Sequence, residues 1–189
     1  MITAFRPHGD PAGYSPVIRV ECFSTPAPTA ALRALHWHSM DIYADILPGR
    51  SLGGFALLEC YDQRLGLEYT PISTHAIRYS FPNDTVELNV DVQTGIIYKI
   101  SALTNYKGTL LGSIHVGDSI PDVLQNDPSF IYDDFEMAYF SEGSPGVALE
   151  PDVHDPWPED FPYLRIGAIT IFDAEYIRNA RKLTLDYTC

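Results

Sequence analysis

A strict alternation of apolar and polar residues between Val86 and Gln93 limits the fold of this chain more than any other feature. Valine or leucine occupies every second position there, with polar residues between. Successive residues of a strand point to opposite faces of a sheet, so this pattern predicts a strand with one wet face. Thr94-Gly95 follows, and then the segment Ile96–Leu103, in which most residues are apolar. Because glycine adopts the positive φ that tight turns need, these segments predict an antiparallel β-hairpin.

A short helix is predicted further along the chain. Either Asp118 or Ser119 can cap its N-terminus, since both side chains accept hydrogen bonds from free backbone N–H groups. Pro121 is tolerated in a first turn, and the Asp122 carboxylate favours the positive end of the helix dipole. We expect this helix to end by Asp127.

The first fifty residues differ in character from the rest. Residues 1–16 are rich in proline and glycine and predict an extended arm, and Val17–Phe23 predicts a short strand. Between Thr29 and Leu47, apolar residues recur at spacings of three to five. This spacing predicts the longest helix of the chain, ended by Pro48-Gly49.

We therefore divide the chain into an arm, strand and helix at 1–50 and a body at 51–189. The body is predicted to be α+β, with a mostly antiparallel sheet and two or three helices. Two stretches of it, 51–107 and 108–173, carry similar motifs in the same order. The correspondences are Leu52–Phe55 with Leu111–Ile114, His75–Phe81 with Phe130–Phe140, Val86–Leu88 with Val147–Leu149, and Ile97–Ile100 with Ile166–Ile169. They indicate either a tandem duplication of a strand–helix–strands unit or a chance likeness of short motifs.

The negative charge of the chain is concentrated in one segment. Residues 108–164 contain twelve Asp and Glu and no Lys or Arg, whereas the other residues hold thirteen carboxylates and twelve basic side chains. Large aromatic residues stand among these carboxylates, several of them on the proline-rich run Pro151–Tyr163. A field of like charges destabilises the compact state, so it calls for a complementary partner or a role in solubility.

Aromatic residues surrounded by charge are typical of protein interfaces, and a loop stiffened by proline loses less entropy on docking. The complementary partner would be strongly basic, as a nuclease is around its phosphate-binding groove. We therefore predict a surface that binds a basic protein. It comprises Tyr132, Asp133, Asp134, Glu136, Asp155, Trp157, Glu159, Asp160 and Phe161. A solvated face that serves only solubility is the other interpretation.

A zinc site has weaker support. His36 and His38 would share one face of a strand and could bind zinc together with a carboxylate such as Asp41 or Asp45. The predicted helix separates the two histidines, and no third ligand stands out. We therefore predict no metal and no cofactor.

Catalysis by carboxylates is the enzymatic alternative. Asp133-Asp134, Glu136 or Glu159-Asp160 could supply the acid pair of a glycoside hydrolase, but adjacent acids on a strand point to opposite faces. No nucleophile elbow, phosphate-binding loop or EF-hand loop occurs in the sequence. We predict a binding protein with no catalytic residues, and keep a hydrolase or metal-dependent enzyme with an acidic cleft, or a structural module, as alternatives.

Cysteine usage and hydropathy bear on location. Cys22, Cys60 and Cys189 are odd in number and widely spaced, which favours reduced thiols in the cytoplasm over a disulfide framework. No apolar run approaches the length that crosses a bilayer, and the N-terminus lacks the pattern of a signal peptide. The net charge of −13 disfavours direct binding to nucleic acid or to a membrane surface.

Four segments carry a likeness to a known group of proteins: Val86–Asp91, Thr94–Ile100, Tyr106–Gly108 and Gly112–Val123. With them, the region from about Leu52 to Phe172 resembles the immunity proteins of bacterial contact-dependent growth inhibition and related polymorphic toxin systems. The resemblance implies a small acidic cytosolic protein that binds the catalytic domain of a neighbouring toxin and blocks it. It implies no particular binding residues, because such proteins share none.

Overall fold

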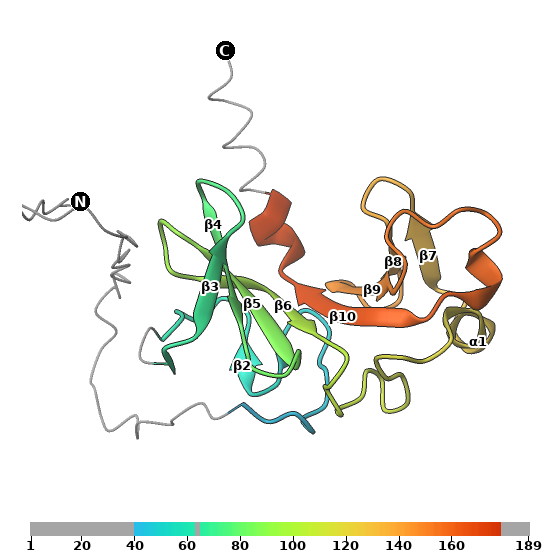
Figure 1. Cartoon of the computed structure of the whole chain (residues 1–189), viewed down its shortest axis with the longest axis horizontal. Coiled ribbons are helices and arrows are strands. Elements are labelled where there is room, and N and C mark those ends of the chain that lie inside the picture. The colour runs from blue at the N-terminus through green and yellow to red at the C-terminus, as the bar shows by residue number, and fades with distance from the viewer. Residues whose placement is uncertain (1–39, 63–64, 179–189) are drawn as a thin grey trace, which may run out of the picture.

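The computed structural model describes residues 40–62 and 65–178 of the 189-residue chain. The predicted arm at 1–16, the predicted strand at 17–23 and the histidines at 36 and 38 lie outside these residues. The described part has an α+β fold dominated by antiparallel sheet, which confirms the predicted class (Figure 1).

Eight strands form one antiparallel sheet. They are β3 (Glu68–Pro71), β4 (Ala76–Ser80), β5 (Val86–Asp91), β6 (Ile97–Ala102), β7 (Phe130–Asp133), β8 (Ala138–Ser141), β9 (Val147–Pro151) and β10 (Ile166–Phe172). Their order across the sheet is β3-β4-β5-β6-β10-β9-β8-β7. Two four-stranded meanders therefore meet through their last strands, β6 and β10 (Figure 1).

The remaining elements are short. Strands β1 (Ser51–Leu52) and β2 (Phe55–Ala56) pair with each other. Helix α1 (Ile120–Asn126) and the 3-10 helix η2 (Phe161–Tyr163) belong to the second half of the chain. Residues 174–178 are helical and lie at the end of the described part.

The predicted hairpin and short helix are both confirmed. Strands β5 and β6 are joined by a turn in which Gly95 has a φ of 71° and Asp91 Oδ1 accepts a hydrogen bond from the Thr94 N–H at 2.8 Å. Ser119 caps α1, because its Oγ accepts from the Asp122 N–H at 3.4 Å. The last residue of the helix is Asn126 and its C-cap is Asp127, as expected.

The two meanders match each other across their strands. On one face of the sheet, each strand of a meander contributes one residue that lies opposite a residue of the neighbouring strand, so each meander has a row of four. These sets are Tyr69, Tyr79, Leu88 and Ile100 in the first, and Tyr132, Tyr139, Leu149 and Ile169 in the second. Ser101 and Thr170 follow the last members of the two sets, lie opposite each other, and join their hydroxyls at 2.8 Å. An approximate two-fold axis thus passes between Ser101 and Thr170.

The long helix predicted for Thr29–Leu47 is wrong where the structure describes it. Residues 40–47 form turns and isolated bridges. The Ile46 N–H donates to the Thr109 carbonyl at 2.7 Å, and the Leu47 N–H donates to the Ser51 carbonyl at 2.9 Å. Ile46 is buried in the core beneath the sheet, so its apolar character reflects that burial and not a helical face.

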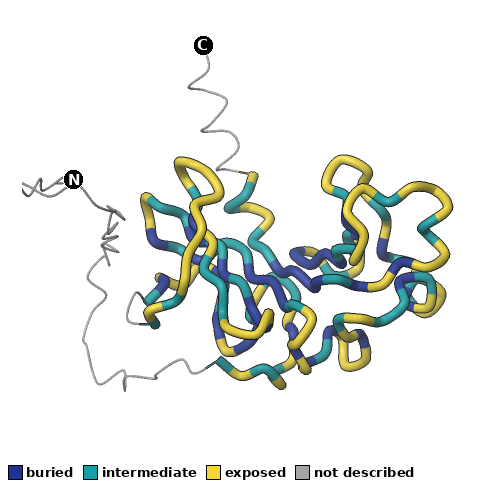
Figure 2. Tube along the Cα trace, viewed as in Figure 1, coloured by how far each residue is buried: buried dark blue, intermediate teal, exposed yellow. Residues whose placement is uncertain are grey.

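The core lies against one face of the sheet. Residues between Ile46 and Tyr61 and between Tyr106 and Val123 cover this face and bury the inward side chains of the strands. Figure 2 shows the buried positions along the central strands and the exposed loops around them. Gly108 permits a close approach in this cover, since a Cβ there would lie 1.9 Å from the Ala44 carbonyl oxygen.

Cys60 departs from the expectation of reduced thiols, because it is disulfide-bonded. Three widely spaced cysteines do not reveal which of them approach one another in the fold. The cytoplasmic location that rested partly on free thiols stays a prediction. Among the helices of the described residues, none has the length and apolar character to span a membrane.

Candidate partner-binding surface

The β7–β8 hairpin carries the first part of the predicted surface. Asp133 ends β7, and its Oδ1 accepts hydrogen bonds from the backbone N–H groups of Phe135 at 2.9 Å and Glu136 at 3.0 Å. Met137 completes the turn with a φ of 52°. The Phe135 side chain at the tip is 86% exposed. This turn is therefore fixed by Asp133, while its aromatic residue stands in solvent.

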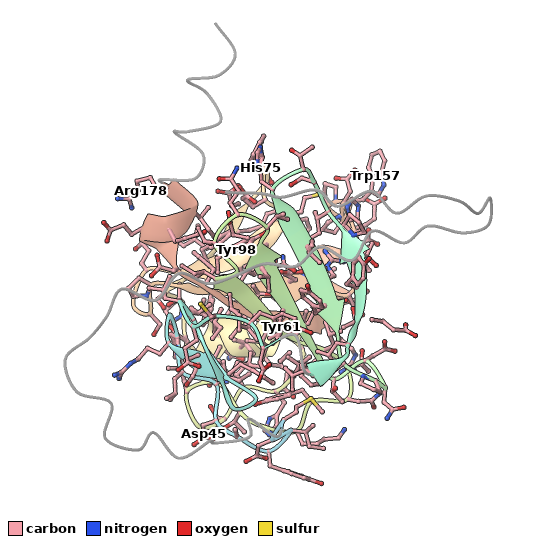
Figure 3. The ribbon with its side chains drawn as sticks, turned by 90° about the vertical axis from the view of Figure 1, so that its left-hand side faces the viewer. Asp45, Tyr61, His75, Tyr98, Trp157 and Arg178 are labelled. Atoms are coloured by element: carbon pink, nitrogen blue, oxygen red, sulfur yellow. The ribbon has the colours of Figure 1, made fainter. Side chains whose placement is uncertain are left out.

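The connection between β9 and β10 carries the second part. Asp160 Oδ2 accepts from the Trp157 N–H at 2.9 Å, and the Asp160 N–H donates back to the Trp157 carbonyl at 2.8 Å. The Tyr163 N–H donates to the Asp160 carbonyl at 2.8 Å. Trp157 is 70% exposed and Tyr163 is 82% exposed. Figure 3 labels Trp157 at the outer margin of the molecule.

The two segments meet at Tyr132. Its ring lies edge-on to Phe161 at a centroid distance of 5.1 Å and packs against Tyr139 at 4.9 Å. Burial raises the pKa of the Tyr132 hydroxyl, and the carboxylates of Asp134 and Asp155 raise it further. Residues that are distant in sequence thus converge on one end of the second meander, where Figure 2 shows exposed loops.

All nine predicted residues lie on these two segments, but they do different things there. Tyr132 and Phe161 are half-buried and pack on each other, so they support the surface from below. Asp133 and Asp160 hold turns through their carboxylates. The other five are exposed: Asp134, Glu136, Asp155, Trp157 and Glu159. That any of them binds a partner stays a prediction.

Phe135 and Tyr163 are exposed aromatic residues that the sequence analysis did not select. Phe135 stands between Asp134 and Glu136, in the very pattern by which the other residues were chosen. The sequence did not show that Asp133 would fold the chain back at this point and bring Phe135 to the tip of a hairpin.

Three exposed carboxylates of this end have no ion-pair partner in the described part of the chain. They are Asp134, Asp155 and Glu159. Arg165, which follows the acidic segment, directs its Nη1 to the Gly117 carbonyl at 2.9 Å. Since unpaired acids of one sign add their fields, this end presents a negative potential to approaching molecules.

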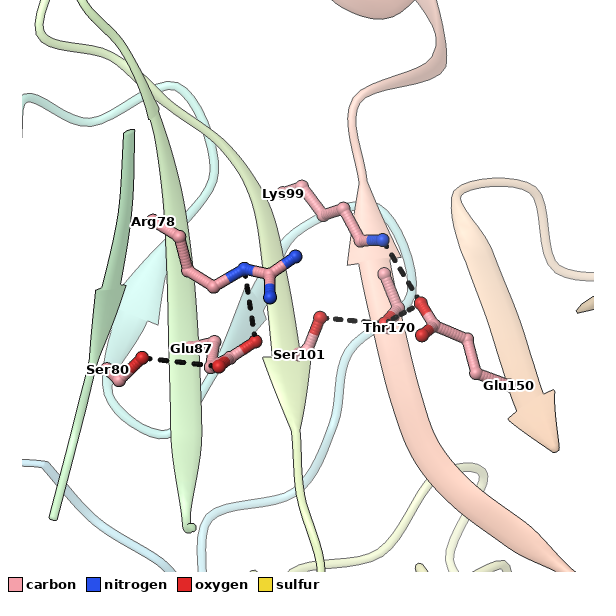
Figure 4. Close-up of polar contacts among 7 residues, drawn as sticks. All are labelled: Arg78, Ser80, Glu87, Lys99, Ser101, Glu150 and Thr170. Carbon is pink, nitrogen blue, oxygen red and sulfur yellow. Dashed lines mark hydrogen bonds and ion pairs between the residues drawn. The ribbon is translucent and has the colours of Figure 1, made fainter. Parts of the chain in front are cut away.

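The outer face of the sheet carries a groove of about 750 Å³. It lies between the strands and residues 174–178, and its polar lining includes Lys99, Glu150 and Thr170. Lys99 Nζ lies 3.1 Å from Glu150 Oε1, and the Thr170 hydroxyl donates to the same oxygen at 2.7 Å (Figure 4). Burial opposes ionisation of Glu150, but Lys99 and Thr170 outweigh it and lower the pKa of Glu150.

This groove offers limited means for catalysis. The Glu150 carboxylate accepts hydrogen bonds from Lys99 and Thr170, and the Asp133 carboxylate accepts hydrogen bonds within its own turn. In the described part of the chain, no group of three or more His, Cys, Asp or Glu side chains could hold a metal ion. Asp41 and Asp45, proposed beside the histidines as zinc ligands, accept instead from the Tyr43 N–H and the Thr109 hydroxyl.

Comparisons of the chain with protein-family models, curated proteins and solved structures found no match.

Proposed function

We propose that this protein is a stoichiometric inhibitor that binds a basic toxin, with a nuclease as the favoured target, through the acidic and aromatic end of its second meander. The observation that carries the proposal is the convergence of two separate loops there. Their exposed carboxylates have no cation between residues 108 and 164 to offset them. This function is the one that the resemblance to immunity proteins implies.

Electrostatics favour such a partner. Complementary charge raises association rates by orders of magnitude at low salt, which an inhibitor needs when it must reach its target before damage is done. Exposed aromatic residues then supply apolar contact area in the interface core. The phosphate-binding groove of a nuclease offers the Lys and Arg side chains that match this surface.

We also propose that the two meanders arose by tandem duplication. The matched residue sets and the axis between Ser101 and Thr170 support this origin. The last two strands of the first unit are joined by residues 92–96, whereas those of the second are joined by the longer run 152–165. The first unit forms its four strands with the short connection. The extra length of 152–165 is therefore not needed to form the strands of the second unit, and we assign it to binding.

A hydrolase that uses the groove is the alternative, and a structural module without inhibitory activity is a further one. The carboxylates of Asp133, Glu136 and Glu150 along the groove are the observation in favour of the hydrolase. Screening the purified protein against glycoside and ester substrates addresses this alternative. Turnover that is lost in Glu150→Gln would support it.

Capture from a lysate of the source organism tests the lead proposal. We expect the full chain to retain one basic protein at equimolar ratio in low salt, and one equivalent of the chain to abolish that protein's nuclease activity. Asp134→Asn with Glu159→Gln should weaken capture. Glu68→Gln with Glu175→Gln, which changes the net charge equally at exposed sites outside the two loops, should not. Retention of no basic protein by the wild-type chain would refute the proposal.

A further inference from the structure

Three aromatic rings of the acidic end are exposed to solvent and do not pack in the core. Phe135, Trp157 and Tyr163 are the most exposed aromatic residues of this end, and the ring contacts there join other residues, Tyr132, Tyr139 and Phe161. Burying a large aromatic side chain is favourable, so leaving three of them in water has a cost in folding. A group of exposed rings on one end indicates a binding surface.

The backbone that carries these rings is held in place by hydrogen bonds. Asp133 fixes the backbone of Phe135, and Asp160 fixes the backbone of Trp157 and Tyr163. The edge-on contact of Tyr132 with Phe161 joins the two loops. Because these side chains have few rotatable bonds and stand on fixed backbone, little conformational entropy is lost when they are contacted.

Carboxylates stand beside two of the exposed rings in the sequence. Asp134 precedes Phe135, and Asp155 and Glu159 lie two residues to either side of Trp157. A ring face attracts a cationic side chain, and a carboxylate accepts hydrogen bonds from the N–H groups of that cation. A guanidinium group uses both at once, since it is planar, stacks on aromatic faces and keeps its N–H donors at its edge. A lysine ammonium is a compact, strongly hydrated charge and gains less from the ring.

We propose that this end is an arginine-recognition surface, on which guanidinium groups of a basic protein stack against Phe135, Trp157 and Tyr163 while the neighbouring carboxylates accept their N–H groups. The inference rests on the proposed function, because it takes the partner to be a basic protein, and it adds the contact chemistry. A second copy of this chain is a poor occupant, since pairing two acidic ends would set like charges against each other.

Two peptides of equal charge, octa-arginine and octa-lysine, serve as probes for the full chain. We expect octa-arginine to bind at least about threefold more tightly at low salt, given a gain of roughly two- to fivefold for each exposed cation–π contact. Replacing Phe135, Trp157 and Tyr163 together by Leu keeps the apolar character and removes the ring faces. This variant should lose the preference for arginine, because its affinity for octa-arginine should fall further than its affinity for octa-lysine.

Ile131→Ala with Val153→Ala is the matched control, since both side chains are exposed and apolar at the same end but carry no ring. The control should keep the preference for arginine. The single variant Phe135→Leu, made at the most exposed ring, should reduce the preference about two- to fivefold and guards against misfolding of the triple variant.

Equal affinity of the wild-type chain for the two peptides, or a preference that survives the triple replacement, would overturn the inference. Either result leaves the capture of a basic toxin intact, and then the surface acts by charge alone. A preference for arginine in a chain that captures no basic protein would instead refute the proposed function.

Discussion

At the scale of single residues, identical side chains have different tasks within a few positions of each other. Asp133 accepts two backbone hydrogen bonds and holds a turn, whereas Asp134 projects into solvent. From the sequence alone, both residues are simply negatively charged side chains. Their tasks differ because only one carboxylate lies within reach of the N–H groups two and three positions ahead, as in an Asx turn.

Replacing Asp133 by Ala is therefore expected to destabilise the fold by about 1–2 kcal/mol, because two backbone donors lose their acceptor. Asp134→Ala should change stability by less than about 0.5 kcal/mol, as is usual for exposed positions. Urea denaturation of both variants gives the comparison. Equal losses would show that the turn does not depend on the Asp133 carboxylate.

Gly108 is predicted to tolerate no side chain. Its added Cβ would fall 1.9 Å from the Ala44 carbonyl oxygen, a backbone atom that cannot rotate away. Gly108→Ala should cost about 1–3 kcal/mol or more through overpacking. Gly143→Ala is the control, since its nearest neighbour would be the Ser129 Oγ at 3.4 Å. A shift in thermal midpoint no larger for Gly108→Ala than for the control would contradict this packing.

At the scale of elements, the sequence predicted best where a pattern is local. The β5–β6 hairpin follows from alternation and a glycine turn, and α1 follows from its cap at Ser119. Residues 40–47 were misassigned because apolar spacing does not distinguish a helical face from a few side chains buried under a sheet. The pairing of Ile46 with Leu110 depends on residues far along the chain, which periodicity cannot detect.

One buried hydroxyl forms hydrogen bonds to neighbouring strands where β6 pairs with β10, which we call the seam. Thr170 is almost fully buried and joins Ser101 at 2.8 Å and Glu150 at 2.7 Å. Thr170→Val keeps the shape but removes both hydrogen bonds and deprives the buried Ser101 hydroxyl of this partner, and we expect a loss of about 1–3 kcal/mol in the free energy of unfolding. Thr109→Val, which removes an exposed hydrogen bond to Asp45, should cost less than half as much. The reverse order in urea denaturation would argue against a polar seam.

The Lys99–Glu150 pair predicts a dependence on pH. The pKa of Glu150 is lower in the folded chain than its ordinary value of 4.5, so its ionised form stabilises the fold above that pH. This stabilisation is lost as the pH falls and the carboxylate is protonated. Because the Glu150 side chain retains 39% exposure, solvent screening keeps the contribution below about 1 kcal/mol.

Glu150→Gln should therefore melt below the wild-type protein at neutral pH, and the difference should shrink as the pH falls below 4.5 and the carboxylate of the folded chain is protonated. Scanning calorimetry across this range supplies the measurement. A difference that is constant with pH would mean that the amide disturbs packing and that the charge of Glu150 is unimportant.

At the scale of the whole molecule, the sheet involves both halves of the chain, whereas the excess negative charge lies in one segment. Two matching meanders form the sheet, and the segment 108–164, which has twelve carboxylates and no Lys or Arg, contains three strands of the second one and its loops. The sequence indicated the acidic segment and its aromatic residues, because composition is local. It could not tell supporting rings such as Tyr132 from exposed ones such as Phe135, because that distinction depends on how the two loops pack.

The measurement that tests the central claim most directly is the association rate of the captured basic partner, followed by stopped flow at about 20 mM and about 300 mM NaCl. We predict that the wild-type rate constant falls at least about tenfold with salt. Asp134→Asn with Glu159→Gln should slow association several-fold at low salt, whereas Glu68→Gln with Glu175→Gln should leave it unchanged. Equal rates for the two double variants would contradict binding through the acidic end of the second meander.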